Sequence, residues 1–107
     1  MQIKFYEKFP DMECLQGDTL GTFSVEMDEN TDLTGASMCL ILENQNGLIL
    51  PKNCTLSGRI FSVQLTSADT ASLSGLYQMH FCLTDSEGLK YRKIAGNLYV
   101  IKTEQGV

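Results

Sequence analysis

Alternation of apolar and polar residues with a period of two is the feature that most constrains the fold of this chain. Phe23, Val25 and Met27 fall on one face of an extended segment, and polar side chains fall on the other. The same pattern returns in residues 59–66 and in residues 77–84. Such alternation is typical of strands that bury one face. We therefore predict strands at all three places.

Turn residues separate the predicted strands and leave room for one short helix. Asn46 and Gly47 lie between two apolar runs, and this pair predicts a hairpin with a type I′ turn. The only helical segment we expect is residues 67–73, with Ser67 as its cap. A βαβ protein would need longer amphipathic helices, and the sequence contains none. The pattern indicates an all-β fold.

The fold class that follows is an immunoglobulin-like antiparallel β-sandwich of about seven to eight strands with one short helical turn. We expect the first strand at residues 2–8, interrupted by Pro10. The last strand is expected at residues 89–102, with a bulge near Gly96. The tryptophan and the inter-sheet disulfide of antibody domains are missing. Residues 1–107 have the length of a single domain, and we predict one.

Gly75 and Tyr77 form the one structural site that the sequence suggests. They enter a predicted strand directly after a short polar turn, where immunoglobulin-like domains often hold a tyrosine corner. In that arrangement the ring of Tyr77 is buried and its hydroxyl bonds the backbone upstream. We expect the bond to fall on residues 67–70.

Composition and charge limit the classes of partner. Hydrophobic residues make up 43% and charged residues 20%, which indicates a folded globule rather than a disordered chain. The net charge of -5 disfavours binding to nucleic acid or to an anionic membrane. The one basic cluster, Lys90, Arg92 and Lys93, is interpreted as a solvated strand edge. The N-terminus has neither a signal peptide nor a membrane anchor, so we expect synthesis in a cytoplasm.

Four cysteines, Cys14, Cys39, Cys54 and Cys82, allow three disulfide pairings, but a cytoplasmic route favours reduced thiols. Their wide spacing does not suggest a zinc site, and Cys39 in particular is expected to be a small core residue. The glycosylation triplet at Asn53 would remain unused on that route.

No catalytic, cofactor-binding or metal-binding residue is nominated, and the chain is predicted not to be an enzyme. His80 and Cys82 share one strand face and are the least unlikely catalytic pair. We expect them on the surface, without a cleft or an orienting third group. Residues 28–39 fail the EF-hand pattern, although a looser calcium site at Glu26, Asp28 and Asp32 stays open.

Several short segments in order along the chain resemble the N-terminal domain of phage baseplate upper proteins and related immunoglobulin-like phage domains. They cover most of the chain between residues 16 and 101. The matching segments are Gln16-Gly17-Asp18-Thr19, Asp32-Leu33-Thr34-Gly35-Ala36, Leu65-Thr66 with Asp69-Thr70 and Leu73, Gly75-x-Tyr77, and Gly96-Asn97-Leu98-Tyr99-Val100. The segment before Gln16 has no counterpart, and the fibre or receptor-binding region that usually follows is missing from this sequence.

The resemblance implies a non-enzymatic structural module of a phage or prophage tail or baseplate, made in a bacterial host and located in the virion. Its partners would be other virion proteins or further copies of itself in a homo-oligomer, with no cofactor. Surplus apolar residues at 48–50 and 99–101 are compatible with an interface, and equally with burial on both faces. The alternative function is a cell-surface or carbohydrate-binding sandwich, for which Tyr6, Tyr91 and Tyr99 are the available aromatic residues.

Overall fold

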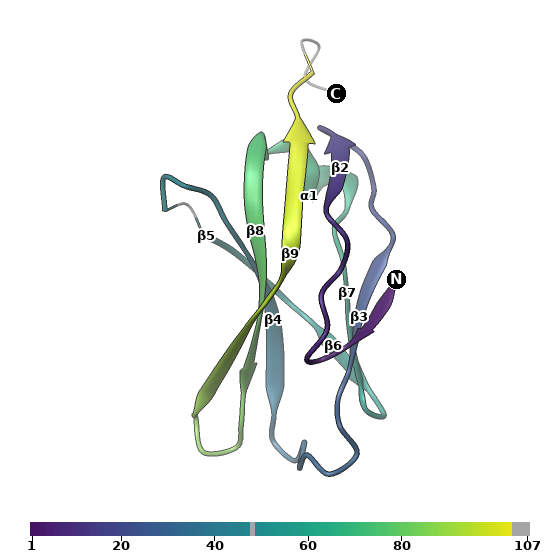
Figure 1. Cartoon of the computed structure of the whole chain (residues 1–107), viewed down its shortest axis with the longest axis vertical. Coiled ribbons are helices and arrows are strands. Elements are labelled where there is room, and N and C mark those ends of the chain that lie inside the picture. The colour runs from purple at the N-terminus through teal and green to yellow at the C-terminus, as the bar shows by residue number, and fades with distance from the viewer. Residues whose placement is uncertain (48, 104–107) are drawn as a thin grey trace.

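The computed structural model describes residues 1–47 and 49–103. Its strands form a four-stranded and a five-stranded sheet that face each other across one apolar core, with a short helix between two of the strands (Figure 1). The predicted all-β, immunoglobulin-like sandwich is confirmed.

The order of the strands is that of an immunoglobulin-like domain. The four-stranded sheet consists of β1 (Gln2–Lys4), β3 (Thr22–Glu26), β7 (Ile60–Gln64) and β6 (Thr55–Ser57), in this order. The five-stranded sheet consists of β2 (Met12–Leu15), β9 (Lys90–Ile101), β8 (Gly75–Thr84), β4 (Ser37–Glu43) and β5 (Ile49–Asn53). These orders correspond to immunoglobulin strands A-B-E-D and A′-G-F-C-C′. Helix α1 (Ser67–Ala71) lies between β7 and β8 in the chain.

The N-terminal segment differs from the single strand expected at residues 2–8. β1 ends at Lys4, and Phe9 then enters the core, where its ring meets that of Phe23 edge-on with centroids 5.3 Å apart. After Pro10 the chain continues as β2 in the other sheet. β1 pairs parallel with β3, and β2 pairs parallel with β9, so the sandwich is not wholly antiparallel.

The hairpin predicted at Asn46 and Gly47 is confirmed, but its turn type is wrong. β4 and β5 pair antiparallel up to Glu43 and Ile49. The carboxamide of Asn44 accepts a bond from the Asn46 amide, and the Asn44 carbonyl accepts one from Gly47. Only Gly47 has a positive φ, whereas a type I′ turn requires two such residues. The turn is instead closed by the two hydrogen bonds that Asn44 accepts, one at its side chain and one at its backbone carbonyl.

Helix α1 begins with a capping box, and its cap lies one residue before the cap expected from the sequence. The cap is Thr66 and not Ser67: its hydroxyl accepts a bond from the Asp69 amide, and the Asp69 carboxylate accepts one from the Thr66 amide. Asp69 also forms an ion pair with Lys52 of β5. The helix is thereby attached to the edge of the five-stranded sheet.

The bulge expected near Gly96 is confirmed. Met79 pairs with Gly96 and His80 pairs with Ile94, which leaves Ala95 as the extra residue. The Ala95 carbonyl accepts a 2.8 Å bond from the Phe9 amide. Because of this extra residue, the β9 side chains on both sides of the bulge point to the same face of the sheet as their partners in β8.

Candidate interaction surface

Exposed apolar residues gather on the outer face of the five-stranded sheet. Leu76 of β8 pairs with Tyr99 of β9, and Ile101 of β9 pairs with Leu15 of β2. The buried residues that alternate with them, such as Tyr77 and Val100 in their strands, point into the core. These four outward residues, which we call the apolar cluster, are 39–50% exposed: Leu15, Leu76, Tyr99 and Ile101. They form one contiguous patch across three strands.

A second apolar row crosses the middle of the same face. The register places Ile41 of β4 beside His80 of β8, and His80 beside Ile94 of β9. Ile94 is 42% exposed, whereas Ile41 is only 8% exposed. His80 Nε2 is buried without a hydrogen-bond partner among the described residues. The polar row of Glu43, Gln78 and Asn97 separates this row from the apolar cluster.

Charged residues on this face divide by sign along the strands. Glu13, on the Leu76 row, and Glu43, on the next row, lie near the apolar cluster. Arg92 and Lys90 lie on the rows of Cys82 and Thr84, at the opposite end of β8. The strand residues on this face are therefore acidic near the apolar cluster and basic at the opposite end, where the turn after β8 itself carries Asp85 and Glu87.

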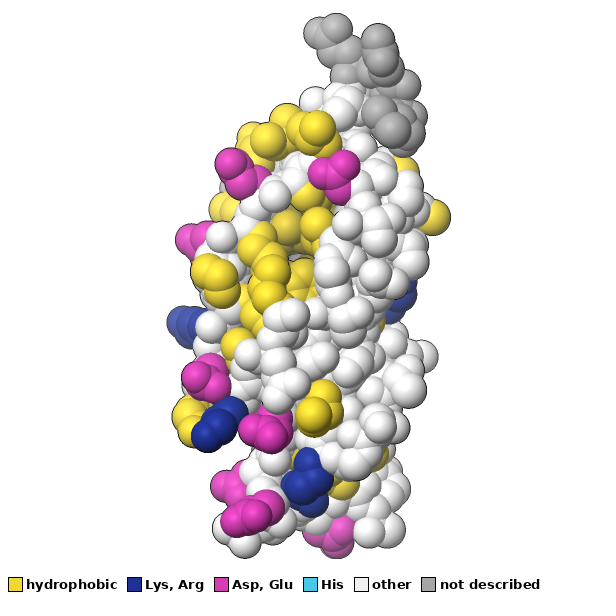
Figure 2. All heavy atoms as spheres, turned by 90° about the vertical axis from the view of Figure 1, so that its right-hand side faces the viewer, with side chains coloured by type: hydrophobic (Ala, Val, Ile, Leu, Met, Phe, Trp, Pro, Cys, Tyr) yellow, Lys and Arg dark blue, Asp and Glu magenta, His cyan; other side chains and the backbone are white. Residues whose placement is uncertain are grey.

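The outer face of the four-stranded sheet has a different character. Thr22 and Ser24 of β3 alternate with buried Phe23 and Val25, and the Ser24 and Ser62 hydroxyls lie 3.1 Å apart across β3 and β7. In Figure 2, the side chains over this sheet are mostly neither hydrophobic nor charged, while hydrophobic side chains gather towards β2. The exposed apolar surface is thus concentrated on one of the two sheets.

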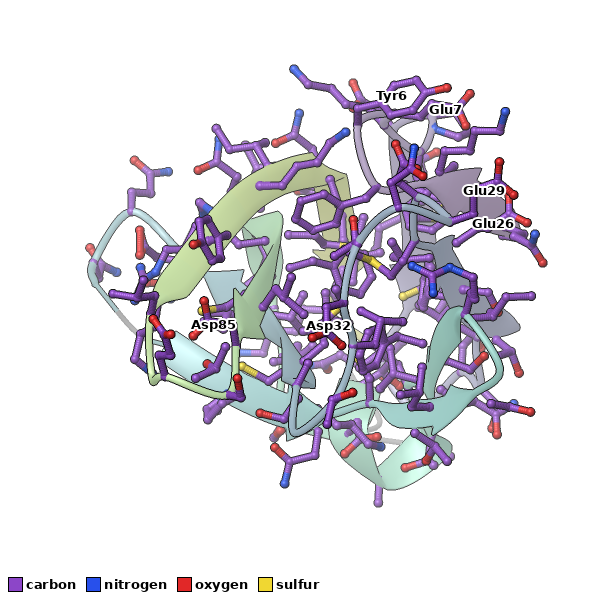
Figure 3. All side chains as sticks on the ribbon, turned by 90° about the horizontal axis from the view of Figure 1, so that it is seen from below. Tyr6, Glu7, Glu26, Glu29, Asp32 and Asp85 are labelled. Atoms are coloured by element: carbon purple, nitrogen blue, oxygen red, sulfur yellow. The ribbon has the colours of Figure 1, made fainter. Side chains whose placement is uncertain are left out.

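The lower end of the sandwich carries acidic loops and a pocket of about 540 Å³ beside Tyr6 and Glu26. Figure 3 shows Glu26 and Glu29 on one side of this end, Asp32 near its middle and Asp85 on the other side. The loop after β3 is held by Arg59, which donates to the carbonyl oxygens of residues 28 and 31.

The calcium site left open in the sequence is not assembled. The carboxylates of Asp28 and Asp32 accept hydrogen bonds from the backbone amides of Asn30 and Thr34, respectively, in their own loop. The hydrogen bond from the Thr34 amide lowers the pKa of Asp32. Across residues 1–47 and 49–103, no three His, Cys, Asp or Glu side chains are grouped so that they could hold a metal ion.

The basic cluster agrees only in part with its interpretation as a solvated edge. Lys90 and Arg92 are exposed, but Lys93 points inward and its ammonium stands 5.8 Å from the Phe5 ring centroid and 5.6 Å from that of Tyr6. Burial lowers the pKa of Lys93. Lys93 differs from its two neighbours because it pairs with buried Phe81, and this pairing places it on the inner face of the sheet.

The predicted surface pair of His80 and Cys82 is also corrected. The two share the outer face, but Cys82 is 3% exposed and lies between Cys39 of β4 and Arg92 of β9. Conversely, Cys39 is not the core residue that we expected: it is half-buried on the outer face, directly beside Cys82. All four cysteines are unpaired in the structure.

Comparison with known proteins supports the fold. No family model matches the chain, and no curated protein matches it. Among solved structures, the N-terminal domain of phage TP901-1 ORF48 is similar, with a TM-score of 0.57 over 94% of this chain and 95% of that one. The two share 11% of their residues. The two domains have the same fold.

Several segments that carry the resemblance in sequence meet at the upper end of the sandwich. The Gln16 side chain donates to the Leu73 carbonyl at 2.7 Å and accepts a bond from the Thr103 amide. Beside it, the Thr70 hydroxyl donates to the Asp18 carbonyl at 2.6 Å. Segments more than fifty residues apart are therefore joined here through side-chain bonds to the backbone.

Tyr77 lies in the same region, with a ring that is 2% exposed. Its hydroxyl accepts a 3.1 Å bond from the Ser74 amide, not from residues 67–70 as expected. Gly75, between the two, has a φ of 93°, which favours glycine. We propose that Gly75 and Tyr77 form the tyrosine corner of this domain. Its hydrogen bond joins Tyr77 to Ser74, three residues upstream, and so spans a shorter turn than the predicted bond to residues 67–70.

The aromatic residues considered for carbohydrate binding do not share a platform. Tyr91 and Tyr99 occupy opposite faces of β9, because Tyr91 pairs with inward Leu83 and Tyr99 with outward Leu76. Tyr6 is 73% exposed on the turn after β1.

None of the helical residues described forms a segment long and apolar enough to cross a membrane.

The sequence interpretation located only part of the apolar surface. Tyr99 and Ile101 had been noted as surplus, and both are exposed, whereas Val100 between them is 1% exposed. Of residues 48–50, Leu48 and the side chain of Ile49 lie outside the described residues. Leu15 and Leu76 were missed, because only the strand register shows that they adjoin Ile101 and Tyr99.

Proposed function

We propose that this chain is a non-enzymatic structural module of a phage or prophage particle, in the tail or baseplate. It binds other virion proteins, including a second copy of itself, through the outer face of the five-stranded sheet. The observation that carries the binding role is the apolar cluster, which leaves four large side chains 39–50% exposed on one face. Contiguous exposed apolar patches are typical of interaction sites. The fold shared with the N-terminal domain of phage TP901-1 ORF48 supports the phage setting.

The size of the outer face suits a protein partner. The five strands contain 4, 12, 10, 7 and 5 residues. At a rise of about 3.3 Å per residue and a spacing of about 4.8 Å between strands, they give a face of roughly 600 Å². That area is about three quarters of the roughly 800 Å² that each partner contributes to a standard interface. A small ligand would leave most of it uncovered.

The distribution of charge favours a second copy in a two-fold arrangement. A copy turned end for end would place the acidic rows of Glu13 and Glu43 over the basic rows of Arg92 and Lys90. A two-fold contact uses the same patch on both partners, so a patch with reversed ends complements itself. The apolar row through His80 would then lie near the axis.

Two measurements test this function. Mass spectrometry of purified particles from the phage or prophage that encodes the chain should detect the chain in a fixed ratio to the other tail proteins. Light scattering after size exclusion should show a mass that rises with protein concentration, and more so at low salt. Absence of the chain from purified particles would refute the virion role, whereas a strict monomer that is nevertheless incorporated would refute only self-association.

A further inference from the structure

Two cysteines stand directly opposite each other on adjacent central strands. Cys39 of β4 pairs in register with Cys82 of β8. The amide of Cys54 donates to the carbonyl of Met38 at 2.9 Å, so the polar backbone groups of Met38 point towards β5 and those of Cys39 point towards β8. The cysteine pair is therefore of the hydrogen-bonded type, in which opposite Cα atoms lie about 5.5 Å apart.

The side chains of this pair are neighbours on the outer face. Cys82 lies close enough to Cys39 to raise the pKa of the Cys39 thiol. Cys82 is 3% exposed, whereas Cys39 is half-buried and reaches solvent. A reagent in solution can therefore reach Cys39 first, with Cys82 held beside it as the second thiol.

The backbone spacing meets the main requirement of a disulfide. Bridged cysteines usually have Cα atoms about 4.4–6.8 Å apart, which includes this pair. Their Cβ atoms are expected about 5.5 Å apart in such a pair, compared with about 3.8 Å in a relaxed disulfide. The two strands must approach slightly for the bond to form, so the bond is strained and readily reduced.

We propose that Cys39 and Cys82 are a reversible redox site that takes a small-molecule disulfide as its oxidant. The Cys39 thiolate attacks one sulfur of the small disulfide, forming a mixed disulfide and releasing one small thiolate. The Cys82 thiolate then attacks the Cys39 sulfur, forming the cross-strand bond and releasing the second small thiolate. Both protons pass through water to the released thiolates, so the protein loses two electrons and the small disulfide gains them.

The surroundings of Cys39 set the pH dependence of this reaction. Burial and then the neighbouring Cys82 raise the pKa of the Cys39 thiol, although Lys90 and Arg92 oppose this increase. Because the thiolate is the nucleophile, oxidation should be slow at neutral pH and accelerate about tenfold per pH unit while the thiol stays mostly protonated. Of the other cysteines, Cys14 is buried in the core and burial raises the pKa of Cys54 to about 12.

The test incubates the folded chain with oxidised glutathione at several pH values, then quenches the reaction with acid and maps the products by proteolysis and mass spectrometry. We expect a mixed disulfide on Cys39, followed by a linked Cys39–Cys82 peptide, with two of the four thiols left free. Reduced glutathione should reverse the link. The variant Cys82→Ser should stop at the mixed disulfide, while the double variant C14S/C54S should still form the link.

The same chain unfolded in urea provides the control for selectivity, and it does not depend on whether Cys82→Ser folds. Unfolded chains should give mixed pairings among all four cysteines, and the folded chain should give one. The site is refuted if the folded chain gives no link, joins Cys39 to Cys54, or yields the same mixture as the unfolded chain.

Discussion

The hydroxyl of Thr70 donates a hydrogen bond of 2.6 Å to the backbone carbonyl of Asp18, although 52 residues separate the two. Among the described residues, Thr70 is the only buried polar or charged one, and it is 0% exposed. The bond joins helix α1 to the loop after β2. Together with the Gln16–Leu73 bond, it closes the upper end of the sandwich through side chains that contact backbone rather than each other.

Thr70→Val should destabilise the domain by about 1 kcal/mol, because valine keeps the shape of the side chain but removes the hydrogen bond to the Asp18 carbonyl. Urea unfolding followed by circular dichroism measures this change. Thr22→Val, at an exposed position of β3, is the control and should change stability little. Equal midpoints for the two variants would show that the Thr70 bond contributes nothing.

Tyr77→Phe tests the proposed tyrosine corner. The substitution removes the acceptor of the Ser74 amide and should cost about 1 kcal/mol in unfolding free energy. The matched control is Tyr91→Phe, since that hydroxyl is exposed and contacts Asp85 only at 3.4 Å. If both variants unfold at the same urea concentration as the parent chain, the corner has no stabilising role.

Gly96→Ala should be among the more destabilising glycine substitutions. Gly96 has a φ of 147°, and an added Cβ would lie 3.1 Å from the Phe9 carbonyl oxygen. Backbone strain of this kind costs about 1–3 kcal/mol. Gly21→Ala is the control, because no atom lies within 4 Å of its added Cβ. Thermal unfolding should separate the two variants clearly; a Gly96→Ala protein as stable as Gly21→Ala would contradict the role of the bulge.

Asp69→Asn should reduce the dependence of stability on pH in acid. Burial alone would raise the pKa of Asp69, but bonds from Lys52 and Thr66 outweigh it and hold the pKa below its usual value. A depressed folded-state pKa contributes stability that is present above the unfolded pKa and lost as the pH falls through the folded one. The parent chain should thus lose its advantage over Asp69→Asn, about 1 kcal/mol at pH 7, as the pH falls below the unfolded pKa of about 4. An advantage that persists at pH 2 would exclude this ionic contribution.

The sequence predicted the fold where one local rule dominated. Phe23 and Val25 alternate with polar residues along β3, and this period determines which face is buried. Phe9 was missed because it stands between a lysine and a proline, with no period around it, and only its packing against Phe23 shows that it completes the core. The split of the N-terminus between two sheets depends on the same long-range contact.

The candidate surface was less predictable than the fold. Alternation shows that Tyr99 and Leu76 leave the core, but not that they are neighbours, because neighbours across strands depend on register. Cys82 was expected at the surface for the same reason: alternation assigned its face correctly, but it does not show that Cys39 and Arg92 lie beside it on the adjacent strands. The local pattern predicts which face of the sheet a side chain occupies, whereas its neighbours on adjacent strands are known only once the sheet is assembled.

The most direct test of the interaction surface is incorporation of variant chains into particles, measured as the ratio of the chain to other tail proteins by quantitative mass spectrometry. Leu76→Ser removes a side chain of the apolar cluster that is 50% exposed, and Leu89→Ser removes one that is 54% exposed in the turn between β8 and β9. Both variants should fold like the parent chain by circular dichroism. We expect Leu76→Ser to reduce incorporation at least about tenfold, as the loss of about 1.4 kcal/mol of binding would, and Leu89→Ser to leave it unchanged. Equal incorporation of the two variants would contradict the assignment of the outer face of the five-stranded sheet as the binding surface.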